Sequence, residues 1–199
     1  MKSPPSLHRS ITQSLRGVSI GLIGAGTMGQ ALIQGLLAHG LSRRALSAAD
    51  PSSAARARVR RRFHIHITEE NGQVVRRCDV VILAVKPQQV PELIASLAPS
   101  VTRSRLVISI AAGITLRWLE ARLPGVPIIR AMPNLPATVG CGFSAIALGR
   151  RATARHRTIA LAIFRAVGEA IELPERSFDA ITAVSGSGPA YVFFLVQAW

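Results

Sequence analysis

Gly24, Gly26 and Gly29 stand in the spacing G-x-G-x-x-G, directly after a short apolar segment at residues 18–23. In such a turn the first glycine permits a tight bend, the second lets a pyrophosphate approach the backbone, and the third lets a helix pack closely on the preceding strand. The N-terminus of that helix offers unpaired N–H groups and a positive dipole end to the pyrophosphate. The alternative is a glycine-rich turn that only packs. Because strand, turn and helix follow in this order, the sequence predicts a dinucleotide-binding site.

An acidic residue stands where such a site would meet the adenine ribose. Asp50 follows a second apolar segment, 21 residues after Gly29, and a carboxylate there accepts a hydrogen bond from the ribose 2′-hydroxyl, which favours NADH. Ser52, Ser53 and Arg56 follow at once and offer hydroxyls, a helix N-terminus and a guanidinium to a 2′-phosphate. NADPH and NADH therefore both stay candidates, with NADPH favoured. The alternative role for Asp50 is to cap the next helix.

Polar side chains follow other apolar segments as well. In an open α/β sheet, ligands bind beyond the carboxyl ends of the strands, so these loops should converge on one cleft. Lys86 ends an apolar segment in a chain whose 24 basic residues include only one other lysine, Lys2. It is interpreted as an ammonium beside the cofactor or an anionic substrate, with a solvated lysine as the alternative. Asn134, between Pro133 and Pro136, is predicted to contact cofactor or substrate, or otherwise to be a turn residue.

The segment SGSGP at residues 185–189 opens the last apolar stretch of the chain. Ser187 is predicted to cap a helix that has Pro189 in its first turn. Ser187 and Gly188 would then lie next to the substrate in the wall of the cleft. The alternative is tight packing between two domains.

Apolar segments alternate with helical patterns from residue 17 to residue 173. The pattern predicts strands at 18–23, 45–49, 65–67, 80–85, 106–110, 126–129, 143–148 and 170–173. It predicts helices at 27–38, 53–62, 73–77, 91–97, 116–123 and 152–167. Gly40 is the signal that ends the first helix, and Thr115 is the predicted N-cap of the fifth. Continuous apolar strands between helices are typical of a parallel sheet covered on both faces, so we expect an α/β fold, a Rossmann-type dinucleotide-binding domain at 17–173.

The two ends of the chain depart from this pattern. Residues 1–16 are basic and lack the apolar core of a secretory signal, so they are predicted to form a flexible N-terminal extension. Residues 174–199 are interpreted as the beginning of an all-helical domain, with helices at 178–184 and 188–199. The last helix is strongly apolar and stops without a C-terminal cap, so the chain is interpreted as breaking off inside that domain.

Composition narrows the remaining functions. The net charge is +14, but the densest arginine cluster, at residues 56–62, has no interleaved stacking aromatic beyond Phe63, so specific nucleic-acid recognition is not expected. No apolar run reaches the ~18 residues that a membrane span needs, so no membrane partner is expected. Cys78 and Cys141 are expected to be reduced in a cytoplasmic protein. His64 and His66 are expected to flank one core position, and no metal site is predicted.

Five segments, taken together, carry a resemblance to pyrroline-5-carboxylate reductases. In order they are GLIGAGTMGQAL, DVVILAVKPQ, SIAAGIT, RAMPNLPATVGCG and TAVSGSGPAYVF, and the similarity runs from Val18 to the last residue. The AVKP and SGSGPAY segments are the distinguishing ones. The resemblance implies that 1-pyrroline-5-carboxylate is reduced to L-proline by hydride transfer from NADPH or NADH, the final step of proline biosynthesis.

The resemblance also implies which residues bind the cofactor. The segment that would hold the pyrophosphate consists of Ile23, Gly24, Ala25, Gly26, Thr27, Met28 and Gly29. Asp50 and Ser52 would face the adenosine ribose, and Asn71 would contribute to cofactor binding. The nicotinamide side would be lined by Ala84, Val85, Lys86, Pro87, Ala111, Ala112 and Gly113.

No catalytic acid–base pair stands out, and the catalytic residue stays unassigned. A protonated cyclic imine accepts hydride directly, so the site needs chiefly to position the imine carbon and to bind the carboxylate. Leu135 stands where the family usually has threonine, and the chain ends at Trp199, before helices that in the family contact substrate and form the dimer. The resemblance implies a homo-oligomer, but dimerisation and activity of this shortened chain stay open. The alternatives are an inactive nucleotide-binding fragment and a related Rossmann reductase of another imine or a 2-hydroxy acid.

Overall fold

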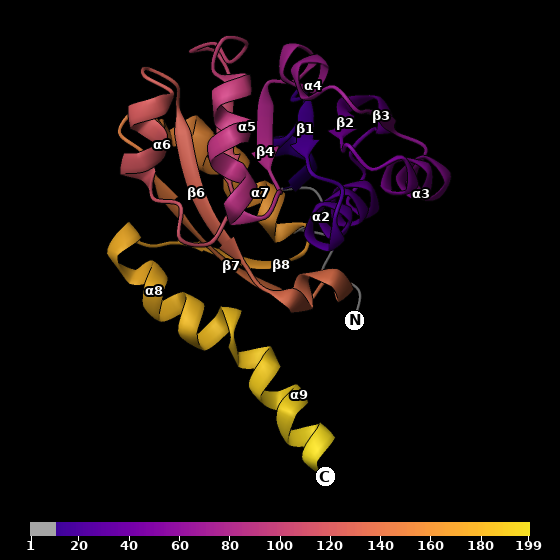
Figure 1. The fold of residues 1–199 in the computed structure, drawn as a ribbon, viewed down its shortest axis with the longest axis vertical. Coiled ribbons are helices and arrows are strands. Elements are labelled where there is room, and N and C mark those ends of the chain that lie inside the picture. The colour runs from indigo at the N-terminus through magenta and orange to yellow at the C-terminus, as the bar shows by residue number, and fades with distance from the viewer. Residues whose placement is uncertain (1–10) are drawn as a thin grey trace.

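The computed structural model describes residues 11–199, and one eight-stranded sheet runs through that part of the chain (Figure 1). The strand order is β3-β2-β1-β4-β5-β6-β7-β8. The strands are β1 (Ile20–Ile23), β2 (Leu46–Ala49), β3 (His66–Thr68), β4 (Val80–Leu83), β5 (Leu106–Ser109), β6 (Ile128–Pro133), β7 (Gly142–Leu148) and β8 (Gly168–Glu172). Every strand that the sequence predicted is present, with bounds that shift by a few residues. The change of direction in the strand order lies between β1 and β4, beside the glycine turn.

The sheet is parallel from β3 across to β6, as predicted, but β7 runs antiparallel to β6. The prediction of a wholly parallel sheet is wrong at this pair. Residues 134–141 connect the two strands and form only a short 3-10 turn, Leu135–Val139. A parallel crossover needs a dozen residues or more, so a connection of this length returns the chain antiparallel. The longer helical connection from β7 to β8 restores parallel pairing.

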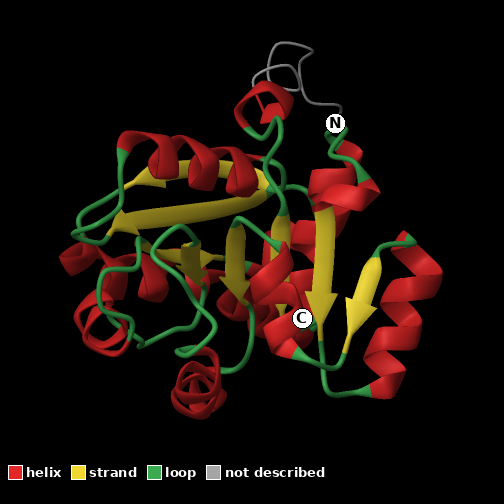
Figure 2. Cartoon of the chain, turned by 90° about the horizontal axis from the view of Figure 1, so that it is seen from above, coloured by secondary structure: helices red, strands yellow, loops and turns green. Residues whose placement is uncertain are grey.

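Helices cover both faces of the sheet, as Figure 2 shows from above. One face packs against α2 (Thr27–Ala38), α3 (Ser53–Phe63) and α7 (Ala154–Arg165). The other packs against α4 (Asn71–Arg77), α5 (Val90–Leu97) and α6 (Leu116–Arg122). Strands β1, β2, β4 and β5 are buried at every position. This explains why they are continuous apolar runs rather than alternating ones.

The segment just before the sheet corrects one prediction. Residues 11–14 are helical, and Ile11 and Leu15 are each 1% exposed within the hydrophobic core. These two residues are four apart and therefore share one side of a helical turn. The prediction of a flexible extension at 1–16 is wrong for residues 11–16. Residues 1–10 lie outside the described part of the chain.

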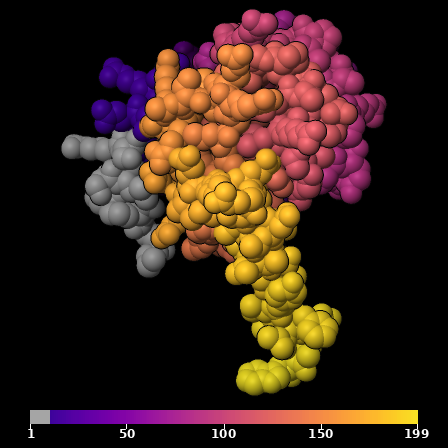
Figure 3. Space-filling view, turned by 90° about the vertical axis from the view of Figure 1, so that its left-hand side faces the viewer, coloured from indigo at the N-terminus to yellow at the C-terminus, as the bar shows by residue number. Residues whose placement is uncertain are grey.

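The C-terminal segment projects from the body of the molecule as a rod (Figures 1 and 3). It consists of α8 (Phe178–Ile181), a π-helical turn (Thr182–Gly186) and α9 (Gly188–Ala198). The predicted break at Ser187 is wrong, because Ser187 has helical angles, makes no side-chain cap and donates its N–H to the carbonyl of Thr182. By length and composition alone Glu175–Ala198 would suffice to cross a membrane, which for a single helix is weak evidence.

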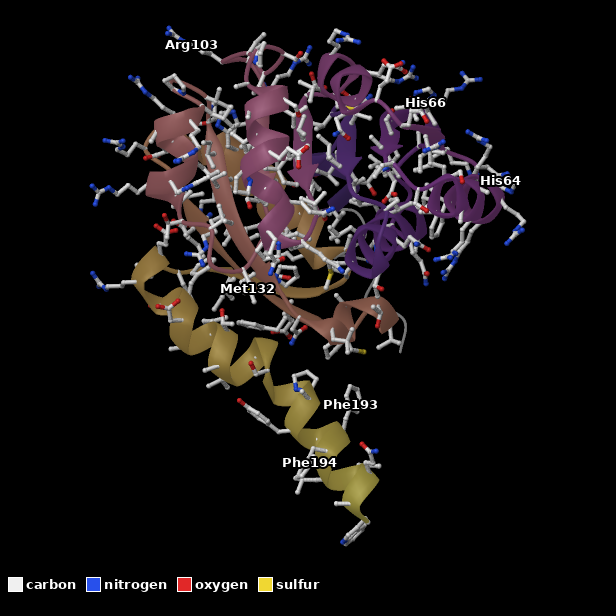
Figure 4. All side chains as sticks on the ribbon, in the orientation of Figure 1. His64, His66, Arg103, Met132, Phe193 and Phe194 are labelled. Atoms are coloured by element: carbon white, nitrogen blue, oxygen red, sulfur yellow. The ribbon has the colours of Figure 1, made fainter. Side chains whose placement is uncertain are left out.

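The large apolar side chains of α9 are exposed. Phe193 and Phe194, 59% and 71% exposed, extend from different sides of α9 (Figure 4). The exposed apolar set on this segment is Val184, Tyr191, Val192, Phe193, Phe194, Leu195, Val196 and Trp199. Apolar side chains thus surround α9, and no side of this helix is consistently polar.

A carboxylate at the opposite edge of the sheet from the glycine turn should make stability depend on acid pH. Burial by itself raises the pKa of Asp79, but hydrogen bonds from Ser19 and the charge of Arg105 outweigh it and hold the pKa below its ordinary value of 3.8. A carboxyl group whose pKa is lower in the folded state stabilises the fold at any pH above its unfolded pKa. This contribution is lost as the pH falls through the folded pKa.

We expect Asp79→Asn to cost about 0.5 kcal/mol at pH 7, since the group is largely exposed, and to cost nothing near pH 2. Urea unfolding at both pH values measures this, with Glu169→Gln, an exposed carboxylate on β8, as the control. An equal loss at both pH values would contradict the assignment.

Candidate functional site

The glycine turn after β1 is held against the neighbouring strand by its first and third glycines. Gly24 has a φ of +99°, and a Cβ there would lie 2.4 Å from the carbonyl oxygen of Ala84. A Cβ on Gly29 would lie 2.4 Å from the carbonyl oxygen of Gly24. The first contact brings the turn against the end of β4, and the second brings α2 against the turn. The positive φ of Gly24 fits the tight bend that the sequence predicted for the first glycine, and the contact at Gly29 fits the close helix packing predicted for the third.

Gly26, unlike Gly24 and Gly29, has no protein atom close to its Cβ position. A Cβ built on it would meet no protein atom within 4 Å, and its φ of −71° is open to any residue. Gly26 is exposed and immediately precedes α2, whose first turn has no side-chain cap. The first N–H groups of a helix have no partner within the helix. The turn therefore leaves a space lined by backbone donors, which fits a pyrophosphate.

Asp50 ties this turn to the start of α3. Its Oδ2 accepts a hydrogen bond from the N–H of Ala25 at 2.8 Å, and its Oδ1 accepts one from Ser52 at 2.9 Å. The cap of α3 is Ser52, whose hydroxyl accepts from the N–H of Ala55. The alternative that Asp50 caps α3 is therefore wrong. Each carboxylate oxygen retains acceptor capacity, so the ribose contact stays a prediction.

Arg56, considered for a 2′-phosphate, is engaged within the chain. Its Nη1 donates to the carbonyl oxygens of Asp50 and Pro51 at 3.0 and 2.8 Å, and its Nη2 pairs with Glu69 Oε2 at 3.0 Å. The guanidinium thus stabilises the loop after β2 by bonding to its carbonyl oxygens. A phosphate would have to share it with these three partners.

The loops after β4 and β5 end at the same edge of the sheet as the glycine turn, because β1, β4 and β5 are parallel and in register. Ala84 and Val85 contact the turn directly, since both lie near the Cβ position of Gly24. Lys86 is exposed, and Pro87 begins a 3-10 turn that leads into α5. The loop after β5 contains Ala111, which is buried, and Ala112 and Gly113, which are exposed. The contacts of these residues with a nicotinamide stay predictions.

Asn71 is the first residue of α4, after β3, and is half-buried. Strand β3 is parallel to β2, so Asn71 lies at the same edge as Asp50. Its role toward the cofactor stays a prediction.

Alternate residues of β6 and of the loop after it seat the C-terminal helical segment against the sheet. Arg130 is 5% exposed and donates to Glu175 Oε1 at 2.9 Å, below the ring of Phe178. Met132 lies between the sheet and the helix (Figure 4), with its Cε 3.3 Å from the Cβ position of Gly186.

Asn134 makes the third of these contacts. Its Nδ2 donates to Ser185 Oγ at 2.9 Å, and its Oδ1 accepts from the N–H of Phe143 at 2.8 Å. Asn134 is thus more than a turn residue, since it joins β6, β7 and the π-helical turn. Ser187 and Gly188 lie just beyond Ser185 along the helix, and their place next to the substrate stays a prediction.

Sequence reasoning missed Ser185, Arg130 and Glu175. An arginine inside an apolar strand is the signal that could have found Arg130, because such a group is buried only with a partner. Ser185 lies in the SGSGP segment, but the predicted cap drew attention to Ser187.

The remaining titratable candidates lie away from this edge. His64 and His66 point outward on the α3 side (Figure 4), and both are exposed, while Ile65 between them is buried. Burial raises the pKa of the Cys78 thiol, and burial followed by the charge of Arg155 lowers the pKa of His156. Among residues 11–199, no three His, Cys, Asp or Glu side chains are placed to hold a metal ion. The cleft edge is therefore built mainly from backbone and small polar groups.

Comparison with known proteins agrees with this geometry. A sequence family described as NADP oxidoreductase, coenzyme F420-dependent, matches residues 19–113. A pyrroline-5-carboxylate reductase from Methanosarcina acetivorans is 42% identical over 181 residues, covering 90% of this chain and 67% of that protein. One from Pseudomonas aeruginosa is also 42% identical, covering 90% of this chain and 66% of its own length. The chain thus spans about two thirds of the length of these relatives.

Solved structures show the same relationship. The pyrroline-5-carboxylate reductase of Coxiella burnetii superposes with a TM-score of 0.85 at 34% identity, covering 91% of this chain and 68% of that one. The enzyme of Plasmodium falciparum, solved with NADP bound, gives a TM-score of 0.82 at 28% identity over 92% of this chain and 67% of that one. Identity of about 40% across nine tenths of the sequence, together with the shared fold, decides the assignment: this chain belongs to the pyrroline-5-carboxylate reductase family.

Proposed function

We propose that the protein reduces the C=N bond of 1-pyrroline-5-carboxylate to give L-proline, using NADPH or NADH. The observation that carries the proposal is the open space at Gly26, over the N-terminus of α2, in a chain of this family. A backbone cradle that a Cβ would fill fits a dinucleotide pyrophosphate. A relative of the same fold was solved with NADP bound, which supports use of the same cofactor class.

Different residues of the chain contribute different parts of this reaction. Gly24 and Gly29 keep the turn and α2 packed against β4, and Asp50 holds the turn at Ala25. When bound, the nicotinamide cofactor supplies the hydride for the imine carbon. The loops after β4 and β5, Ala84–Pro87 and Ala111–Gly113, would hold the nicotinamide side. The C-terminal helical segment, bonded to Asn134 through Ser185, would border the site beyond β6. Positioning of this kind lowers the barrier without a strongly perturbed acid or base.

The organisation of the chain is part of the proposal. Residues 17–173 form the nucleotide-binding domain, and residues 174–199 begin the helical domain. A cytoplasmic location and, as the sequence resemblance implies, a homo-oligomer complete the proposal. Light scattering on the purified chain tests the oligomer, and cell fractionation tests the location.

The direct test is turnover with product analysis. The purified chain is incubated with 1-pyrroline-5-carboxylate and NADPH or NADH in parallel, and L-proline is quantified. Proline formation that depends on the cofactor is the expected result. Cofactor binding without proline would favour a nucleotide-binding fragment, and turnover of 2-hydroxy acids alone would favour a different Rossmann reductase.

Asp50 should matter more for NADH than for NADPH. The Asp50 carboxylate accepts from the N–H groups of Ala25 and Ser52. In Asp50→Asn one of these N–H groups keeps an oxygen acceptor, and the other faces the NH2 group of the amide. We expect the Kd for NADH to rise about tenfold and that for NADPH to rise less, because the variant also removes a charge that would repel a 2′-phosphate. Fluorescence titration measures both constants.

Glu70→Gln is the matched control, since it neutralises an exposed carboxylate near the same edge that makes no side-chain cap. It should bind both cofactors as the parent does. An unchanged Kd for NADH in Asp50→Asn would remove Asp50 from the site.

A further inference from the structure

The Asn134 amide has one orientation that satisfies its neighbours. The N–H of Phe143 needs an acceptor, so the atom 2.8 Å from it is the amide oxygen. The amide nitrogen therefore faces Ser185 Oγ at 2.9 Å and donates to it. Because the amide nitrogen has no lone pair to accept with, the Ser185 oxygen is the acceptor of this bond.

The Ser185 hydroxyl consequently keeps a hydrogen that the bond to Asn134 does not use. A hydroxyl carries one donor and two acceptor positions. Within residues 11–199, the structure records no acceptor for this hydrogen, and the side chain is only half-buried. Ser185 is thus a hydrogen-bond donor whose hydrogen is kept from pointing at Asn134.

This donor lies at the ligand edge of the sheet. Asn134 directly follows β6, and the 3-10 turn that starts at the next residue, Leu135–Val139, packs against α2. Helix α2 is the one whose N-terminus borders the open space at Gly26. Ser185 itself lies in a π-helical turn, where Ser187 N–H bonds the carbonyl of Thr182. Turns of this kind inside helices recur at functional sites.

We propose that Ser185 contacts ligand in this site, donating its hydroxyl hydrogen to an oxygen acceptor of the bound molecules, and that Asn134 is the positioning residue that turns the hydroxyl outward. The proposal rests on the proposed function. The shared chemistry of the acceptor is a carbonyl or carboxylate oxygen. It has two sources, the carboxamide of the nicotinamide and the carboxylate of the substrate.

Four variants of the whole chain test this. Ser185→Ala removes the donor and Ser185→Thr keeps it. Asn134→Asp keeps an acceptor for Phe143 but has no amide hydrogen, so Ser185 must turn its own hydrogen inward to keep the link. Ser96→Ala is the matched control, because the Ser96 hydroxyl bonds the Leu93 carbonyl in its own helix, α5.

The readouts are the Kd for NADPH alone and the Kd for L-proline in the presence of NADP+, with thermal unfolding of each variant. We expect Ser185→Ala and Asn134→Asp to weaken one of the two ligands about tenfold, while Ser185→Thr and Ser96→Ala stay within about twofold of the parent. Loss confined to NADPH identifies the carboxamide as the acceptor, and loss confined to L-proline identifies the carboxylate.

Unchanged binding of both ligands in Ser185→Ala would overturn the proposal, even if that variant unfolds at a lower temperature, because the contact would then be structural. Absence of binding of either ligand by the parent would overturn it too. Binding by the parent without turnover would refute the proposed reaction alone, and turnover in all variants at parental affinity would refute the role of Ser185 alone.

Discussion

Gly26→Val should abolish cofactor binding while the protein stays folded. A Cβ at this position meets no protein atom within 4 Å, and the backbone angle φ of −71° is unstrained, so we expect the valine side chain to occupy the space proposed for the pyrophosphate. The expected cost in stability is about 1 kcal/mol, from a poorer residue at the start of α2. The expected rise in the Kd for NADPH is at least about a hundredfold, since the phosphate can no longer approach the backbone donors. Fluorescence titration and urea unfolding give the two values.

Gly29→Ala is the contrasting variant in the same turn. Its Cβ would lie 2.4 Å from the carbonyl oxygen of Gly24, a backbone atom that cannot move aside alone. We expect this single methyl group to destabilise the fold by about 2 kcal/mol, in the range of overpacked sites. An unchanged NADPH affinity in Gly26→Val would refute the assignment of this turn to the cofactor.

Arg130→Met should loosen the C-terminal helical segment from the sheet. The guanidinium of Arg130 is buried, pairs with Glu175 and lies 4.8 Å from the ring centre of Phe178. Removing Arg130 leaves the half-buried Glu175 with the N–H of Leu116 as its remaining partner, so we expect the lost pair and ring contact to cost about 2 kcal/mol. We expect a loss of that size in urea unfolding, together with faster amide hydrogen exchange at residues 175–186.

Glu175→Gln removes the negative charge of Glu175 but keeps an oxygen that can accept the same hydrogen bonds. Its amide oxygen still accepts from the N–H of Leu116 and from Arg130, the two donors that Glu175 Oε1 serves. The expected loss is about 1 kcal/mol. If Arg130→Met left exchange at 175–186 unchanged, the helical segment would be held by its apolar contacts and not by this pair.

The nucleotide half of the fold could be predicted because its signals are local. Helix α2 begins and ends where the glycines and the apolar spacing place it, at Thr27 and Ala38, with Gly40 in the left-handed conformation after it. Thr115 caps α6 as expected. The roles of Gly24 and Gly29 follow from the same local geometry.

Features set by distant contacts were missed. The direction of β7 depends on which strand it joins, although the short connection at 134–141 held the clue. Burial of Ile11 and Leu15 depends on a core formed by later residues, and the basic composition around them concealed it. The helix runs through the SGSGP segment although local signals favoured a cap at Ser187, and Ser185 there is bonded to Asn134 from another strand.

The spacing of the anchors on β6 has a consequence for how this region tolerates change. Arg130 and Met132 face the helical segment, as Asn134 does just beyond the strand. Ile129 and Ala131, which alternate with them along the chain, belong to the core on the opposite face. Side chains alternate along a strand, so inserting or deleting one residue here would exchange the two sets at once. The register of β6 therefore determines both which residues enter the hydrophobic core and which residues contact the C-terminal helical segment. Among natural and engineered variants, substitutions should accumulate between residues 128 and 134 long before any change in length does.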